Sequence, residues 1–193
     1  MLNTNSDTLI VNSWIERITS KLTKGVVITP ITILLGTILL IISAKIKVPL
    51  YPVPMTLQPL AVLMIGMLFG RNLAAATVGL YIFQGLMGLP VFAYGGGFMY
   101  ILGPTGGFII GFLLAAIILG HLADKGWGRS LFTSILCMVI GLFIIYFMGI
   151  LQLSLIKGFD YAILKGFYPF IIGDLYKLLL AGIIVPNIWK LAK

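Results

Sequence analysis

The sequence predicts an all-α membrane protein with six transmembrane helices. Hydrophobic residues make up 60% of its 193 residues and charged residues only 9%, whereas a typical soluble domain carries roughly 25% charged residues. Several apolar runs approach or exceed about 18 residues, the length at which a helix crosses a bilayer. A membrane barrel would instead show short segments of alternating hydrophobicity. These observations place the chain in the cell membrane as a multi-pass protein.

The first 25 residues are expected to form a separate amphipathic segment. The apolar residues there recur at helical spacing and are Val11, Trp14, Ile15, Ile18 and Leu22. They lie opposite a charged face. A helix with this pattern lies along the membrane surface and anchors there. Residues 26–193 are predicted to form one transmembrane domain.

Six apolar segments within this domain are each expected to be a helix, with boundaries accurate to two to four residues. They are residues 26–46, 57–69, 73–87, 106–122, 131–153 and 169–191. Gly70, Arg71 and Asn72 separate the second from the third, because a glycine beside a charge marks a turn. Both of these helices are short for a bilayer of about 30 Å, so we expect them to be tilted or shielded by neighbours.

The distribution of lysine and arginine predicts that both termini are cytoplasmic, because basic residues favour that side. With six spans in this orientation, eight basic residues near helix ends lie inside: Arg17, Lys21, Lys24, Arg71, Lys125, Arg129, Lys190 and Lys193. Four lie outside: Lys45, Lys47, Lys157 and Lys165. The net charge of +8 is therefore expected to orient helices, and no nucleic-acid partner is implied.

The first outer loop, residues 48–59, is rich in proline. Pro49, Pro52 and Pro54 each fix φ and remove a backbone donor, so this stretch cannot be helical. It is interpreted either as a rigid connector, with Thr56 capping the next helix, or as a lid over a binding cavity. In the second case Thr56 and Gln58 become candidate ligand contacts.

The second outer segment, residues 88–107, is uncharged and contains seven glycines. Glycine lets the backbone approach a ligand closely, and Gly106 opens the fourth helix, whose first N–H groups can receive an anion such as a carboxylate. Tyr94, Thr105 and Gly106 are therefore candidate binding residues. Gly103, Gly107, Gly111 and Ala115 form a ladder of small residues at spacing four, which close helix packing explains without any ligand.

Asp174 and Lys177 lie one helical turn apart inside the last apolar segment. An ionised group at membrane depth costs about 2.5–3.5 kcal/mol on insertion scales, so such a pair indicates a polar ligand, an ion path or a buried ion pair. If Pro169 opens the helix, the pair lies roughly 7 and 12 Å below its outer end. That position favours a ligand with both donors and an acceptor, entering from outside.

Catalytic chemistry has little support in this sequence. It contains a single histidine, His121, a single cysteine, Cys137, and one convincing membrane carboxylate, Asp174. These do not make up the site of an intramembrane serine, zinc or aspartyl protease. No ATPase motif occurs either, so uphill transport would draw on a partner or an ion gradient. We expect no enzymatic activity, no cofactor and no metal site.

Four motifs, in order and in spacing, resemble the BioY family. They are Val53-Pro54-Met55-Thr56-Leu57-Gln58, Gly88-Leu89-Pro90-Val91-Phe92-Ala93, Gly103-Pro104-Thr105-Gly106-Gly107-Phe108 and Gly173-Asp174-Leu175-Tyr176-Lys177. That family supplies the biotin-specific substrate-capture subunits, or S components, of energy-coupling-factor vitamin transporters. The resemblance covers about residues 30–190, and the four motifs together are specific.

The resemblance implies a six-helix bundle that captures extracellular biotin beneath its first outer loop. It also implies partners, namely a membrane coupling subunit and two cytoplasmic ATPases that drive transport. Asp174 and Lys177 match the family's ligand-binding pair. On chemical grounds we assign Asp174 to the ureido N–H groups and Lys177 to the ureido carbonyl, with the valerate tail toward the glycine-rich loop; the reverse orientation places Lys177 on the carboxylate.

S components usually dock on the coupling subunit through an Ala-x-x-x-Ala patch of the first helix. Here the nearest spacing is Gly36, Leu40 and Ala44, in which the larger Leu40 departs from the pattern. Two other functions remain as alternatives. One is a self-sufficient, ion-coupled secondary carrier for biotin or a related vitamin, and the other is a packing subunit without a ligand.

Overall fold

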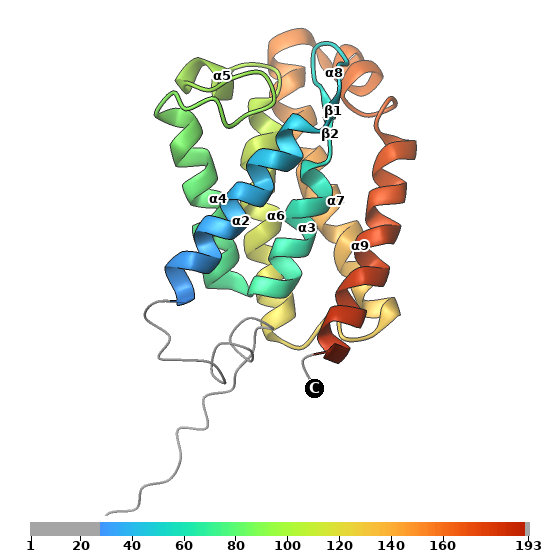
Figure 1. Cartoon of the computed structure of the whole chain (residues 1–193). Coiled ribbons are helices and arrows are strands. Elements are labelled where there is room, and N and C mark those ends of the chain that lie inside the picture. The colour runs from blue at the N-terminus through green and yellow to red at the C-terminus, as the bar shows by residue number, and fades with distance from the viewer. Residues whose placement is uncertain (1–27, 192–193) are drawn as a thin grey trace, which may run out of the picture.

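Helices cover all six predicted apolar segments. The computed structural model describes residues 28–191, so the amphipathic helix predicted within residues 1–25 lies outside the described residues. The six long helices are α2 (Ile28–Lys45), α3 (Gln58–Phe69), α4 (Arg71–Leu86), α6 (Gly106–Asp124), α7 (Leu131–Lys157) and α9 (Ile171–Leu191). Figure 1 shows them running up and down in one bundle. Gly70, with φ of 76°, makes the turn predicted between α3 and α4.

Three of these helices, α6, α7 and α9, are long and apolar enough to cross a membrane by themselves, among the residues that the structure describes. Helices α2 and α3 are apolar but shorter. Large side chains such as Leu35, Phe143 and Leu155 are more than half exposed, as expected for surfaces that face lipid. The chain is a multi-pass membrane protein.

Two short helices lie outside the predicted segments, both at the upper end in Figure 1. They are α5 (Phe98–Leu102), within the glycine-rich segment, and α8 (Phe159–Gly166), directly after α7. Gly97 and Gly158 precede them with φ of 102° and 90°, values that only glycine adopts easily. The chain therefore turns sharply at each glycine before a new helix begins.

Helix α6 is the centre of the bundle. It packs against α3, α4 and α7. In the most apolar 18-residue stretch of α6, 61% is buried inside the bundle, compared with 33% in the corresponding stretches of α7 and α9. Its small residues allow close approach: a Cβ added to Gly111 would lie 2.9 Å from the Cα of Ile145 on α7. Packing thus accounts for Gly107 and Gly111 in the predicted small-residue ladder, because both meet the α7 backbone.

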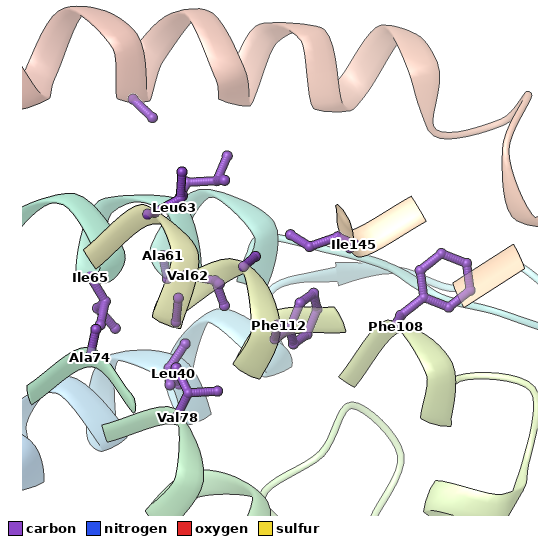
Figure 2. Close-up of a cluster of buried hydrophobic side chains, with 14 of the residues drawn as sticks. Leu40, Ala61, Val62, Leu63, Ile65, Ala74, Val78, Phe108, Phe112 and Ile145 are labelled. Carbon is purple, nitrogen blue, oxygen red and sulfur yellow. The ribbon is translucent and has the colours of Figure 1, made fainter. Parts of the chain in front are cut away.

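The apolar core lies between these helices. Figure 2 shows side chains of α2, α3, α4, α6 and α7 converging on it, among them Leu40, Val62, Leu63, Val78 and Phe112. Leu40, Val62, Leu63 and Val78 are fully buried. Phe112 also forms part of the wall of a cavity above the core, so the packing that holds the bundle together also fixes the cavity's floor.

The proline-rich loop is not helical, as its prolines predict. Instead, β1 (Lys47–Val48) and β2 (Met55–Thr56) pair antiparallel, with Lys47 opposite Thr56. The resulting hairpin lies at the same end of the bundle as α5 and α8 (Figure 1). The ammonium group of Lys45 donates to the carbonyls of Pro90 and Phe92, at 2.6 and 2.7 Å. These bonds join the foot of the hairpin to the glycine-rich segment.

Candidate functional site

A cavity lies beneath the hairpin and the glycine-rich segment. Its empty space, which includes the open mouth, is about 540 Å³. Its walls are mostly apolar, with a few polar groups on different elements. The residues around it are Val53, Pro54, Thr56, Gln58, Pro59, Ala93, Tyr100, Thr105, Phe108, Ile109, Phe112, Ile145, Tyr146, Phe170, Asp174 and Lys177. We call this space the outer chamber.

Asp174 is the most unusual residue of the outer chamber, because it is a carboxylate that is only 4% exposed. Helix α9 begins at Ile171, two residues later than predicted, so Asp174 and Lys177 lie about 4.5 and 9 Å below its start. Asp174 Oδ1 accepts from Lys177 Nζ at 2.6 Å, and Oδ2 accepts from the hydroxyl of Tyr146 on α7, also at 2.6 Å. Each carboxylate oxygen thus has a donor, and its orientation is fixed.

The ion pair is not saturated. An ionised carboxylate offers about four acceptor positions and an ammonium group three donors. Asp174 uses two of them, for Lys177 and Tyr146, while Lys177 uses two, for Asp174 and the carbonyl of Thr56 at 2.7 Å. The pair therefore keeps acceptor capacity and one N–H donor, within a cavity that a polar guest can enter.

A second group of hydrogen-bonded side chains lies on the α3 side of the outer chamber. Gln58 Nε2 donates to the hydroxyl of Tyr81 at 2.7 Å, and that hydroxyl donates to the carbonyl of Val91 at 3.3 Å. Thr56 Oγ1 accepts from the backbone N–H of Gln58 at 3.2 Å. Thr56 thereby supports the start of α3 from just outside the helix, and its side chain stays at the cavity wall.

Aromatic side chains shape the remaining walls. Tyr100 belongs to the chamber wall. Phe92, which does not line the chamber, lies tilted against Tyr100 with ring centroids 4.9 Å apart and meets Tyr81 edge-on at 5.5 Å. Burial raises the pKa of the Tyr100 phenol, outweighing the opposing effect of its hydrogen bonds to Thr105 and Tyr94. A phenol is protonated at neutral pH with or without this shift, so the Tyr100 hydroxyl can serve as a donor at the chamber wall.

The glycine-rich segment is held from below by Gln152 of α7. Its side-chain amide donates to the carbonyls of Ile101 and Gly103, at 2.8 and 2.7 Å. The N–H of Gly106 donates to the carbonyl of Gly103 at 3.1 Å, so this N–H is not available for an anion. Gly106 also lies so close to Ile101 and Gln152 that a Cβ has no room there. Its glycine is required for this contact.

Five of the seven predicted binding residues meet around the outer chamber: Thr56, Gln58, Thr105, Asp174 and Lys177. The other two, Tyr94 and Gly106, are not among the residues around it. Tyr94 is 54% exposed, and the ammonium group of Lys47 lies over its ring, 3.6 Å from the centroid. Sequence reasoning missed Tyr146, Tyr81 and Tyr100, because tyrosines in apolar segments carry no sequence signal of their partners.

The predicted docking positions on α2 face the interior. Leu40 and Ala44 are fully buried, and a Cβ on Gly36 would lie 2.7 Å from the Thr77 side chain. This spacing therefore packs α2 against α4 and α3 and offers no surface to a partner. In the described part of the chain, no three His, Cys, Asp or Glu side chains gather as metal ligands.

Comparison with known proteins relates this architecture to a transporter family. The sequence matches the BioY family over residues 16–193. It is 40% identical over 157 residues to a biotin transporter BioY of Thermotoga maritima, covering 80% of this chain and 92% of that protein. It is 38% identical over 148 residues to a probable biotin transporter BioY of Pyrococcus horikoshii, covering 76% and 87%.

A solved structure is similar in fold as well. The crystal structure of the S-component for biotin from an ECF-type ABC transporter superposes with a TM-score of 0.76 at 29% identity. The match covers 85% of this chain and 92% of that one. The similarity therefore extends over most of both chains.

Proposed function

This chain belongs to the BioY family, and from that premise we propose that it captures biotin in the outer chamber as the membrane S component of an ECF-type vitamin transporter. The single observation that carries the proposal is the unsaturated pair of Asp174 and Lys177 in the wall of that chamber. A buried ion pair adds little stability by itself. A guest that completes its hydrogen bonds explains why the charges are there.

Biotin offers the complementary groups. Its ureido ring presents two N–H donors and one carbonyl acceptor, which match the free acceptor positions of Asp174 and the remaining N–H of Lys177. The apolar thioether ring then lies against Phe108, Phe112 and Ile145, which belong to the chamber wall. The valerate tail points toward the glycine-rich segment, where Thr105 and Tyr100 supply hydroxyl groups.

In the membrane, six spans with both termini in the cytoplasm orient the outer chamber to the cell exterior. The bundle supports this arrangement because Arg71 and Lys190 lie at the ends of α4 and α9, and Lys125 and Arg129 lie between α6 and α7, all at the end opposite the hairpin. Residues 26–193 form the substrate-binding domain. The end of the bundle opposite the hairpin also faces the coupling subunit and the ATPases, which energise the release of biotin into the cell.

Isothermal titration of the purified chain in detergent tests the proposal. Biotin should bind at one site, and small molecules that copurify with the protein should include biotin in mass spectrometry. Absence of any binding heat or melting-temperature shift with biotin would contradict it. Biotin methyl ester tests the orientation: in the proposed pose, Lys177→Met weakens the acid and the ester equally, whereas in the reverse pose it weakens the acid far more.

Vesicle uptake separates the proposal from an ion-coupled carrier. Vesicles that contain this chain alone should bind biotin without accumulating it, whereas addition of the coupling subunit, the ATPases and ATP should drive uptake. Accumulation by the chain alone that an ionophore abolishes would favour the carrier instead. A single charge pair at membrane depth suits ligand binding better than a coupled ion pathway.

A further inference from the structure

A second pocket lies at the opposite end of the bundle from the outer chamber. It is formed where α7 begins and α9 ends, two elements at the lower end of the bundle in Figure 1. Its empty space, counted to the mouth, is about 730 Å³. Its walls consist of Arg129, Ser130, Leu131, Ile183, Pro186, Asn187 and Lys190. We call it the lower pocket; it shares no residue with the outer chamber.

The lower pocket is cationic, and among residues 28–191 no carboxylate forms an ion pair with its two basic side chains. Arg129 and Lys190 are both exposed, and neither forms an ion pair within residues 28–191. Asp124, the nearest acidic residue along the chain, accepts instead from the backbone N–H of Arg71 at 3.1 Å. The Arg129 guanidinium lies over the Trp189 ring, 5.2 Å from its centroid, which holds the charge beside the pocket.

The remaining walls are apolar in part. Leu131 and Ile183 are about half exposed, at 53% and 51%, and both line the lower pocket. Leu131 opens α7, and Ile183 lies about two turns before the end of α9; both helices are long enough to cross the membrane, so the pocket lies near the bilayer interface. Two cations beside exposed apolar side chains fit a phosphate group that carries a hydrocarbon tail, whereas a free phosphate would leave Leu131 and Ile183 uncovered.

We propose that the lower pocket binds the headgroup phosphate of an anionic phospholipid, with Arg129 and Lys190 on the phosphate and Leu131 and Ile183 against the first part of an acyl chain. Basic pockets between transmembrane helices on the cytoplasmic side are suited to such headgroups. The lipid joins the ends of α7 and α9, both of which also form walls of the outer chamber.

Native mass spectrometry of the full chain in detergent, with phosphatidylglycerol or phosphatidylcholine added, tests this proposal. Phosphatidylglycerol should give the higher ratio of lipid-bound to lipid-free protein. Arg129→Gln with Lys190→Gln should lower that ratio about thirtyfold, which corresponds to about 2 kcal/mol for two charges. The matched control, Arg71→Gln with Lys125→Gln, removes the same charge from the same end but outside the pocket, and should retain the preference.

Three further measurements decide the outcome. Arg129→Lys with Lys190→Arg keeps both charges and should keep the preference, and biotin titration shows that each variant is folded. Inorganic phosphate alone should not raise the melting temperature; a rise that requires Arg129 and Lys190 would assign the pocket to a free anion and overturn the lipid proposal. Equal loss of lipid binding in the pocket variant and the control would also overturn it.

Discussion

Replacing both members of the buried ion pair separates a structural role from a ligand-binding role. The variants are Asp174→Asn, Lys177→Met and the double substitution. If the pair only stabilises the bundle, removal of both charges should leave biotin binding unchanged. If it binds the ureido ring, the double variant should fold and fail to bind.

The expected magnitudes follow from the burial of the two groups. Asp174 is 4% exposed, and the Lys177 side chain 12%. Removal of one partner leaves the other charge unmatched, at a cost of about 3 kcal/mol, the lower end of the range for buried pairs because Lys177 retains the carbonyl of Thr56. For a chain of this size each single variant should melt roughly 6–12 °C lower. The double variant leaves no charge behind and should recover most of this loss.

Binding should respond differently. Each single substitution removes a charge-assisted hydrogen bond to biotin of about 1.5 kcal/mol, and should weaken binding at least about tenfold. The double variant loses both bonds, about 3 kcal/mol, and should bind more than about a hundredfold more weakly. Stability and affinity therefore move in opposite directions between the single and the double variants.

Thermal unfolding and isothermal titration in the same detergent measure both quantities. Asp160→Asn with Lys165→Met is the matched control, because it removes one charge of each sign from exposed positions of α8 at the same end of the bundle. It should change neither melting temperature nor affinity. A double variant of Asp174 and Lys177 that binds biotin within threefold of the wild type would refute the reasoning.

Three other predictions concern contacts that surround the site. Tyr146→Phe removes the second donor to the buried carboxylate and should weaken biotin binding about tenfold by titration, whereas Tyr168→Phe, at an exposed tyrosine, should not. Gly111→Ala places a Cβ 2.9 Å from the α7 backbone and should lower the melting temperature by several degrees, while Gly79→Ala meets no atom within 4 Å and should leave it unchanged or raise it. Lys45→Gln loses the bonds to the glycine-rich segment. Because these bonds are worth about 1 kcal/mol, biotin should dissociate about fivefold faster in stopped-flow measurements. An unchanged rate would show that the foot of the hairpin does not retain the ligand.

Much of the fold could be read from composition along the chain. Six apolar segments became six helices, the three prolines of the first outer loop excluded a helix there, and Gly70 made the predicted turn. These features depend on local properties: hydrophobic length, a fixed φ, or a conformation that glycine alone adopts easily. Helices α5 and α8 were missed because neither is long enough to produce an apolar run.

The face that each helix turns inward was not predictable in the same way. Helix α2 is apolar on all sides, so periodicity gave no indication that Leu40 and Ala44 are buried against the bundle. Tyr94 looked like a binding residue by its place in the glycine-rich segment, yet its ring pairs with Lys47 on the outside. In both cases the sequence pattern favoured neither orientation of the side chain, and packing against residues distant in the chain selected one.

The sequence by itself determined that this is a helical membrane protein and that Asp174 and Lys177 are its most expensive residues to bury, because hydrophobicity and charge belong to single residues. The tertiary structure alone decided what surrounds that pair. Tyr146 approaches from α7, and the carbonyl of Thr56 reaches Lys177 from 121 positions away in the chain. A chamber is defined by such distant contacts, which folding creates and which no local pattern records.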